Sequence, residues 1–193
     1  MAFRESHIMR FEADGSLWSE QRVEIPRARG PREQTLDAAF IERLADDYFR
    51  AMRRMTLGVF YSVPRGAGMV MRAPAIGDVL IFDHKQVACE ADRARFSWAV
   101  VGGAMRSRRA PPGGQIIFEV TQDPAGDMLT LIIRVEDYTT RLIDLFGRQL
   151  GIIIYHCTQG LSHKTLTLRF LREQARRLTN SRSGADGFGA WFL

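Results

Sequence analysis

Residues 128–178 read MLTLIIRVEDYTTRLIDLFGRQLGIIIYHCTQGLSHKTLTLRFLREQARRL. From Met128 to Tyr138, apolar and polar side chains alternate, which predicts a strand with one buried face. From about Arg141 to Leu178, apolar residues recur at spacings of three and four, which predicts one long helix. Because a helix that follows strands can bury its apolar side only against their sheet, this stretch predicts an α+β domain closed by a C-terminal helix.

The composition is that of an ordinary globular domain. The chain has 193 residues, of which 46% are hydrophobic and 25% are charged, and this size favours a single domain. The sequence contains no run of about 18 apolar residues, so we expect no membrane span. The first residues, MAFRESHIMRFEADG, carry charges where a signal peptide needs an apolar core. We therefore expect a cytoplasmic protein.

The chain is basic, with a net charge of +5 and a pI of about 9.8, and its only lysines are Lys85 and Lys164. Arginine-rich surfaces can meet nucleic acid or acidic ligands. Aromatic residues are not interleaved with the arginines, and no nucleic-acid motif occurs, so we expect a solvated face and no nucleic-acid partner. The isolated Cys89 and Cys157 form no disulfide framework or zinc motif, and we expect neither a metal nor a cofactor.

Upstream of residue 128 the pattern predicts a hairpin, a helix and then strands. Residues 7–25 predict two strands around a turn at Asp14-Gly15. An amphipathic helix is expected from Leu36 to Met55, with Thr35 as its cap. The strands expected after it are 59–63, 68–73, 78–82, 86–90, 95–101 and 115–121. Short turns between one-sided strands indicate an antiparallel sheet with one buried face.

Three segments lie outside this regular pattern. Residues 102–114, GGAMRSRRAPPGG, are expected to form a mobile loop or a lid. Gly147, Gly151 and Gly160 are expected to mark a kink or a close approach in the terminal helix, whose residues 152–154 could also form a strand. We divide the chain into an N-terminal arm (1–30), a main domain (31–178) and a flexible tail (179–193). The apolar end of that tail, FGAWFL, is expected to dock on this chain or on a partner.

Four sequence segments support a family resemblance. They are FRAMRRM (49–55), AIGDVLIF (75–82), RFSWA (95–99) and the run from Gly114 to Phe118. In this order, with the terminal helix, they resemble the helix-grip fold of the START and pollen-allergen-like superfamily. The nearer likeness is to a bacterial and plant family of unknown function within it, over roughly residues 36–178. The Gly-His-Pro turn, the Gly-Glu pair and the Ser-Arg-Pro of that family are absent here.

The resemblance implies a curved antiparallel sheet of about six to seven strands wrapped around the long C-terminal helix, with a shorter N-terminal helix. It also implies a cavity between the sheet and the long helix. Such cavities commonly hold lipids, polyketides or other largely apolar molecules, and a few members of the superfamily are cyclases or dehydratases.

Strand parity and helix spacing give the candidate site residues. We expect the cavity to be lined by side chains from the strands and from the terminal helix, namely Phe96, Trp98, Phe118, Leu131, Ile133, Tyr155, His156 and Gln159. Candidates for proton transfer are His156, Asp137 and Tyr155. Asp137 continues the inward parity of Val135. Each of these residues has a structural alternative: core packing for the aromatic ones, exposure at a strand end for Asp137 and the polar side of the helix for His156.

Three functions remain open at this stage. The first is binding of an apolar or amphipathic small molecule. The second is a cyclase or dehydratase type of enzyme in natural-product metabolism. The third is an interaction protein that uses its arginine-rich face or its apolar tail, with a homodimer as one form. His156 and His163, seven residues apart, would need a third ligand from the sheet to hold a metal.

Overall fold

The computed structural model describes residues 3–26, 35–111, 113–125 and 127–180. Within these residues eight strands form one antiparallel sheet, in the order β1-β2-β8-β7-β6-β5-β4-β3. Their bounds are β1 Arg4–Phe11, β2 Leu17–Pro26, β3 Tyr61–Arg65, β4 Gly68–Ala73, β5 Gly77–Cys89, β6 Arg93–Gly102, β7 Gln115–Gln122 and β8 Met128–Tyr138.

The described helices are one N-terminal helix and a longer C-terminal run of consecutive helices. They are α1 (Ala38–Met55), α2 (Arg141–Phe146), α3 (Arg148–Tyr155), the π-helix η1 (His156–Gly160) and α4 (Leu161–Asn180). The helix expected from Arg141 is therefore interrupted at Gly147, whose φ of +75° favours glycine. From Arg148 onward α3, η1 and α4 follow one another without a gap, so the alternative of a strand at 152–154 is wrong.

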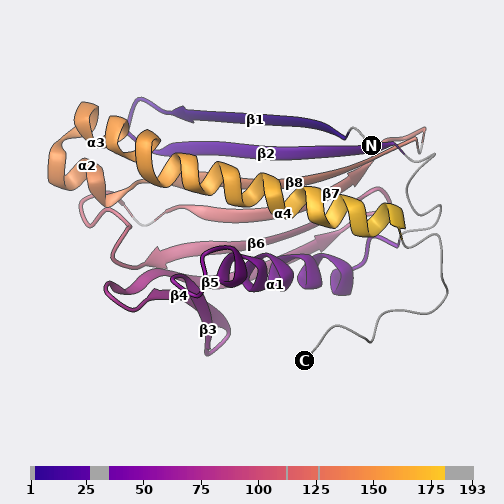
Figure 1. Ribbon diagram of the computed structural model, residues 1–193, viewed down its shortest axis with the longest axis horizontal. Coiled ribbons are helices and arrows are strands. Elements are labelled where there is room, and N and C mark those ends of the chain that lie inside the picture. The colour runs from indigo at the N-terminus through magenta and orange to yellow at the C-terminus, as the bar shows by residue number, and fades with distance from the viewer. Residues whose placement is uncertain (1–2, 27–34, 112, 126, 181–193) are drawn as a thin grey trace.

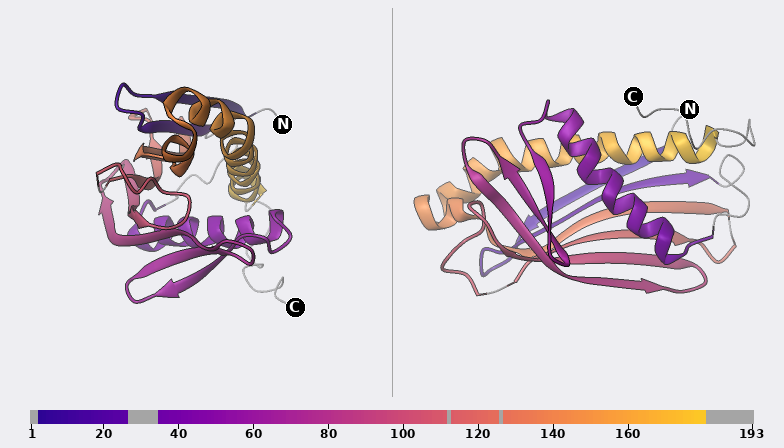
Figure 2. Two further views of the ribbon diagram at one scale, coloured as in Figure 1. Left: turned by 90° about the vertical axis from the view of Figure 1, so that its left-hand side faces the viewer. Right: turned by 90° about the horizontal axis from the view of Figure 1, so that it is seen from below.

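Both long helices lie on the same, concave face of the curved sheet (Figures 1 and 2). Helix α4 packs on β2 and β8, α1 packs on β3, β5, β6 and β7, and the two helices also contact each other. This arrangement confirms the predicted α+β helix-grip architecture of a curved antiparallel sheet around a long C-terminal helix, with a shorter N-terminal helix.

The N-terminal hairpin predicted for residues 7–25 is present as β1 and β2. It does not stand apart from the domain, because β2 pairs with β8 along most of its length and leaves β1 as the edge strand (Figure 1). The sheet therefore has eight strands among the described residues, where the sequence predicted six to seven.

Two local predictions are corrected. Asp37, not Thr35, caps α1, since the Asp37 carboxylate accepts a 2.7 Å hydrogen bond from the Phe40 amide. The strands expected at 78–82 and 86–90 imply a turn between them at Asp83-His84. This segment is instead an irregularity inside β5, where the pairing with β6 shifts between Asp83 and Gln86 and His84 has φ +53°. The runs 78–82 and 86–90 are therefore parts of one strand.

The hydrophobic core fills the space between the concave face and the two long helices. Each central strand contributes alternate residues, such as Phe96 from β6, Phe118 from β7 and Ile133 from β8, all essentially inaccessible. Helix α1 adds Tyr48 and Phe49, whose rings make edge contacts with each other and with Phe118 or its neighbours. Alternation along the strands thus places one face of the sheet in the core.

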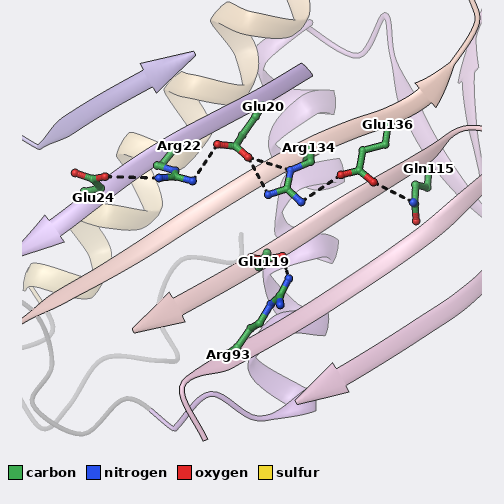
Figure 3. Close-up of polar contacts among 8 residues, drawn as sticks. All are labelled: Glu20, Arg22, Glu24, Arg93, Gln115, Glu119, Arg134 and Glu136. Atoms are coloured by element: carbon green, nitrogen blue, oxygen red, sulfur yellow. Dashed lines mark hydrogen bonds and ion pairs between the residues drawn. The ribbon is translucent and has the colours of Figure 1, made fainter. Parts of the chain in front are cut away.

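The convex face carries a row of paired charges (Figure 3). Arg134 of β8 donates to Glu20 of β2 at 2.8 Å and to Glu136 at 3.2 Å. Arg22 continues the row by pairing with Glu20 at 3.1 Å and with Glu24 at 3.9 Å. Partial burial makes such pairs stronger than isolated surface pairs, and the row links neighbouring strands across the outside of the sheet.

None of the described helices is both long and apolar enough to cross a bilayer. The predicted apolar tail end, FGAWFL, lies outside the described residues, and so does Pro112 of the glycine-rich loop.

Candidate functional site

A cavity of about 320 Å³ lies between the concave face of the sheet and the helices, within the range of small-molecule sites. Helix α1 supplies one wall, and η1 with the first turns of α4 supplies the opposite one. Most of the lining is apolar: Phe49, Met52, Phe60, Met71, Leu80, Phe82, Val100, Met105, Ile116, Val135 and Leu166. Thr158 and Ser162 line the cavity and are also exposed, so the cavity reaches solvent beside them.

Three tyrosines, Tyr48, Tyr138 and Tyr155, bring hydroxyl groups to this apolar space. Burial raises the pKa of Tyr48 to about 12, and it also raises the pKa of Tyr138 and of Tyr155. All three therefore stay protonated at neutral pH and can donate a hydrogen bond. For the same reason they are weak acids, and the phenolate that could act as a base is not populated at neutral pH.

The three hydroxyls differ in their partners. The Tyr48 hydroxyl shares a 3.2 Å hydrogen bond with Thr167, and the Tyr138 hydroxyl donates to the Met105 carbonyl at 2.7 Å. Tyr155 is buried, with an exposed fraction of 5%, and its hydroxyl has no hydrogen-bond partner among the described residues. A protonated and unpartnered hydroxyl beside an apolar cavity is available to a ligand acceptor.

His163 is the other polar group of the lining with an unpartnered atom. Its Nε2 is buried and has no hydrogen-bond partner in the described part of the chain. Burial and the nearby His7 lower the pKa of His163 to about 4, so the imidazole is neutral at pH 7. On β1 and β2 the directly paired His7 and Gln21 also carry a buried, unpartnered atom each, Nε2 and Oε1.

Gln159 sits in the π-helix η1, where the helix is locally wider than an α-helix. Its side-chain oxygen accepts a 3.4 Å hydrogen bond from the hydroxyl of Thr140, a buried residue that follows β8. In the next position back, Thr158 donates to the Ile154 carbonyl at 2.6 Å. The π-turn thus aims one amide and one hydroxyl residue at the cavity, and π-turns recur at functional sites.

No aspartate, glutamate, lysine or arginine is found among the described residues that line the cavity. Within the same part of the chain no group of three His, Cys, Asp or Glu side chains could hold a metal ion, and Cys89 and Cys157 are exposed. The chemistry that this site offers is therefore apolar contact plus neutral hydrogen-bond donors and acceptors.

The structure places two of the expected ligand-binding residues, Tyr155 and Gln159, in the cavity wall. The five expected from the strands are buried in the hydrophobic core without being part of that wall: Phe96, Trp98, Phe118, Leu131 and Ile133. The Trp98 indole N–H is buried and unpartnered among the described residues.

The structure separates the other two candidates from the cavity. His156 is exposed, with its ring against Phe11 at 5.5 Å between centroids. Asp137, expected to face inward by parity, is exposed, because its φ of +54° breaks the strand alternation. Tyr138 takes the inward direction instead and lines the cavity.

Sequence reasoning did not select Tyr48, His163, Ser162 or Leu166 for the site. A signal for the last three exists, because Tyr155, Gln159, Ser162 and Leu166 follow one another at helical spacings of four, three and four. The helix face that carries Tyr155 and Gln159 therefore continues to residues 162–163 and 166, and it does not include His156. No such signal marks Tyr48, which the sequence places on the buried side of a helix.

The glycine-rich loop 102–114 contributes Met105 to the cavity wall and none of its described arginines. Arg106 donates to the carbonyl oxygen of Pro111 at 2.6 Å, within the loop itself. Ser107 donates to Asp144 of α2 at 2.7 Å, and the Arg108 amide donates to the same carboxylate. The described part of the loop is thus tied to α2.

The fold and the cavity together define a helix-grip protein with an apolar internal site. No family model matches the sequence, and no curated protein matches it. Among solved structures, CalU16 from Micromonospora echinospora is similar over 93% of this chain and 98% of its own, with 13% sequence identity and a TM-score of 0.30. At this TM-score the likeness carries no argument, and the arrangement of the strands and helices alone shows the fold.

Proposed function

We propose that this protein binds one apolar or amphipathic small molecule in the cavity between the sheet and the C-terminal helix. The observation that carries the proposal is a 320 Å³ space with apolar walls, lined by Tyr155, whose hydroxyl has no partner among the described residues. Apolar enclosure supplies affinity, while a few placed polar groups orient the ligand.

The lining also limits the class of ligand. An ionised group buried without a counter-charge costs several kcal/mol, and the described lining has no side chain that is charged at pH 7. We therefore expect the buried part of the ligand to be uncharged and to carry an oxygen that accepts from Tyr155. A charged group, if present, would remain near Thr158 and Ser162, where the cavity reaches solvent.

Native mass spectrometry of the freshly purified protein, compared with its denatured mass, tests this proposal. We expect an extra mass that leaves on denaturation. The variant Leu166→Trp should lack it, because the larger side chain fills the cavity, whereas Leu161→Trp, at an exposed position on the same helix, should keep it. Equal retention by both variants, or a bare mass that takes up no apolar compound, would overturn the proposal.

A second candidate is proton transfer in a cyclase or dehydratase type of reaction. His163 favours it, because a neutral imidazole with a buried, unpartnered nitrogen lines the same cavity as three tyrosines. A pKa of about 4 makes His163 a weak base, so binding remains the first proposal. The test is the mass of the molecule recovered from wild type and from His163→Gln. An identical molecule in both would speak against turnover, and a heavier or lighter one in the variant would support it.

A further inference from the structure

The corner formed by α2 and α3 exposes four large apolar side chains within nine residues. Leu145 is 61% exposed, Phe146 49%, Leu150 50% and Ile153 58%. Single exposed apolar residues are common on soluble proteins, but a cluster marks an interaction site. We call this cluster of four residues the apolar corner.

Two glycines hold this corner in place at the end of the molecule. Gly147 reverses the chain after the six residues of α2, and Gly151 lets α3 approach α2 closely. A Cβ atom on Gly151 would lie 2.7 Å from the Leu142 carbonyl oxygen and 2.8 Å from the Ile143 Cα. The two helices therefore pair tightly and project beyond the ends of the strands (Figure 1).

Arginines surround the apolar corner. Arg108 and Arg109 are exposed, and the loop that carries them is fastened to α2 through Asp144. Arg141 and Arg148 begin α2 and α3 themselves. No ion pair of Arg108 or Arg109 occurs within 4 Å among the described residues.

The acidic residues on the segments that form this end are Asp137, Asp144, Glu12 and Asp14. Asp144 accepts from the loop, Asp14 accepts from Ser16, and Glu12 pairs with Arg10 at 2.7 Å. Residues 10–16, 104–111 and 137–151, which form this end, hold six arginines and four carboxylates, a net charge of 6 − 4 = +2.

We propose that the apolar corner inserts into the interface of an anionic lipid bilayer. The four apolar side chains would enter the boundary between headgroups and acyl chains, while the arginines stay at the level of the phosphates, which their planar forks bind well. A second copy docked on the same face would bring arginines against arginines, and this charge clash disfavours self-association.

The corner also adjoins the cavity, since α3 leads directly into η1 and α4. Tyr155 and Gln159, both in the cavity wall, follow Ile153 by two and six residues. If the proposed function holds, docking would bring the cavity within two helical turns of the membrane surface. This last step rests on the proposed function, whereas the docking itself does not.

Vesicle flotation of the full chain tests the proposal. The probes are vesicles of pure phosphatidylcholine and vesicles with about 30% phosphatidylglycerol, at low salt and at about 0.5 M salt. We expect partition into the anionic vesicles at low salt and at least a tenfold smaller partition into the other conditions. Leu150→Ser with Ile153→Ser should reduce the partition at least tenfold, and Arg108→Gln with Arg109→Gln should remove its dependence on lipid charge.

Ile8→Ser, a similarly exposed position in the middle of the edge strand β1, is the matched control and should float like wild type. The proposal is overturned if wild type floats with neither vesicle, or if the serine double variant floats as well as the control. It is also overturned if wild type forms concentration-dependent oligomers that the serine double variant lacks, because the corner would then be a protein interface.

Discussion

The two faces of the sheet differ in how far their polar groups are paired. On the convex face, Glu20, Arg134 and Glu136 pair with one another across β2 and β8. The buried atoms there without a partner among the described residues, Nε of Arg22 and of Arg93, belong to guanidinium groups that are themselves in ion pairs. On the concave side, the Tyr155 hydroxyl and the buried Nε2 of His163 have no partner among the described residues. Buried polar groups are normally paired, and exceptions often mark functional positions. We therefore expect the convex charges to act on stability alone, and the unpartnered concave groups to be available to the proposed ligand.

The largest effect is expected from truncating the concave face. Phe118→Ala removes an inaccessible ring that contacts Tyr48 and Phe96, and should lower the free energy of unfolding by about 3–5 kcal/mol. Ile117→Val, the next residue along β7 and equally buried under the convex face, should cost about 1 kcal/mol. Urea denaturation measures both values. A loss of about 1 kcal/mol or less for Phe118→Ala would contradict the close ring packing of the concave face.

The second effect is a pH dependence carried by His163. Its pKa is about 4 in the folded protein and about 6.5 when unfolded, so between these values the unfolded chain binds the extra proton. His163 therefore costs no stability above about pH 7, and the free energy of unfolding falls by up to about 3 kcal/mol as the pH drops toward 4.

Comparison of variants isolates this contribution. His163→Gln should flatten the fall in stability between pH 7 and pH 5, whereas the exposed His156→Gln should leave it unchanged. Thermal unfolding at a series of pH values measures the difference. If wild type and His163→Gln show the same pH dependence, the imidazole is not buried as described.

The third effect concerns the convex charges. Arg134→Met leaves the buried Glu20 with Arg22 as its remaining ion-pair partner, and should cost about 2 kcal/mol. Glu20→Gln combined with Arg134→Met should recover part of that loss, because the buried side chain at position 20, which lost Arg134, no longer carries a charge. Arg50→Met, which breaks the exposed pair with Asp47, should cost less than about 0.5 kcal/mol. Equal losses for Arg134→Met and Arg50→Met would show that the convex row adds nothing beyond ordinary surface pairs.

The regular elements could be predicted from the sequence because their burial follows a simple period. Alternation along β6, β7 and β8 identified the inward residues Phe96, Phe118 and Leu131, and helical spacing identified α1 and the C-terminal run. The predictions at Asp83-His84 and for Asp137 were wrong where a residue other than glycine adopts a positive φ. Periodicity contains no signal for such a residue, which shifts every side chain after it to the other face.

The cavity was only half predictable. Tyr155 and Gln159 follow from the helix spacing, yet a third wall residue, Tyr48, belongs to α1 and comes from more than a hundred residues away in the chain. Which inward residues pack solidly and which border empty space depends on how far apart the sheet curvature holds α1 and α4. That separation is a property of the assembled fold, which no single stretch of sequence encodes.

Titration with the uncharged fluorescent probe N-phenyl-1-naphthylamine tests the central claim, an accessible binding cavity on the concave side, most directly. We predict saturable binding of one probe per chain in wild type and in Thr121→Trp on the convex face, and at least tenfold weaker binding in Leu166→Trp. Equal binding by wild type and Leu166→Trp, or the absence of saturable binding in wild type, would contradict it.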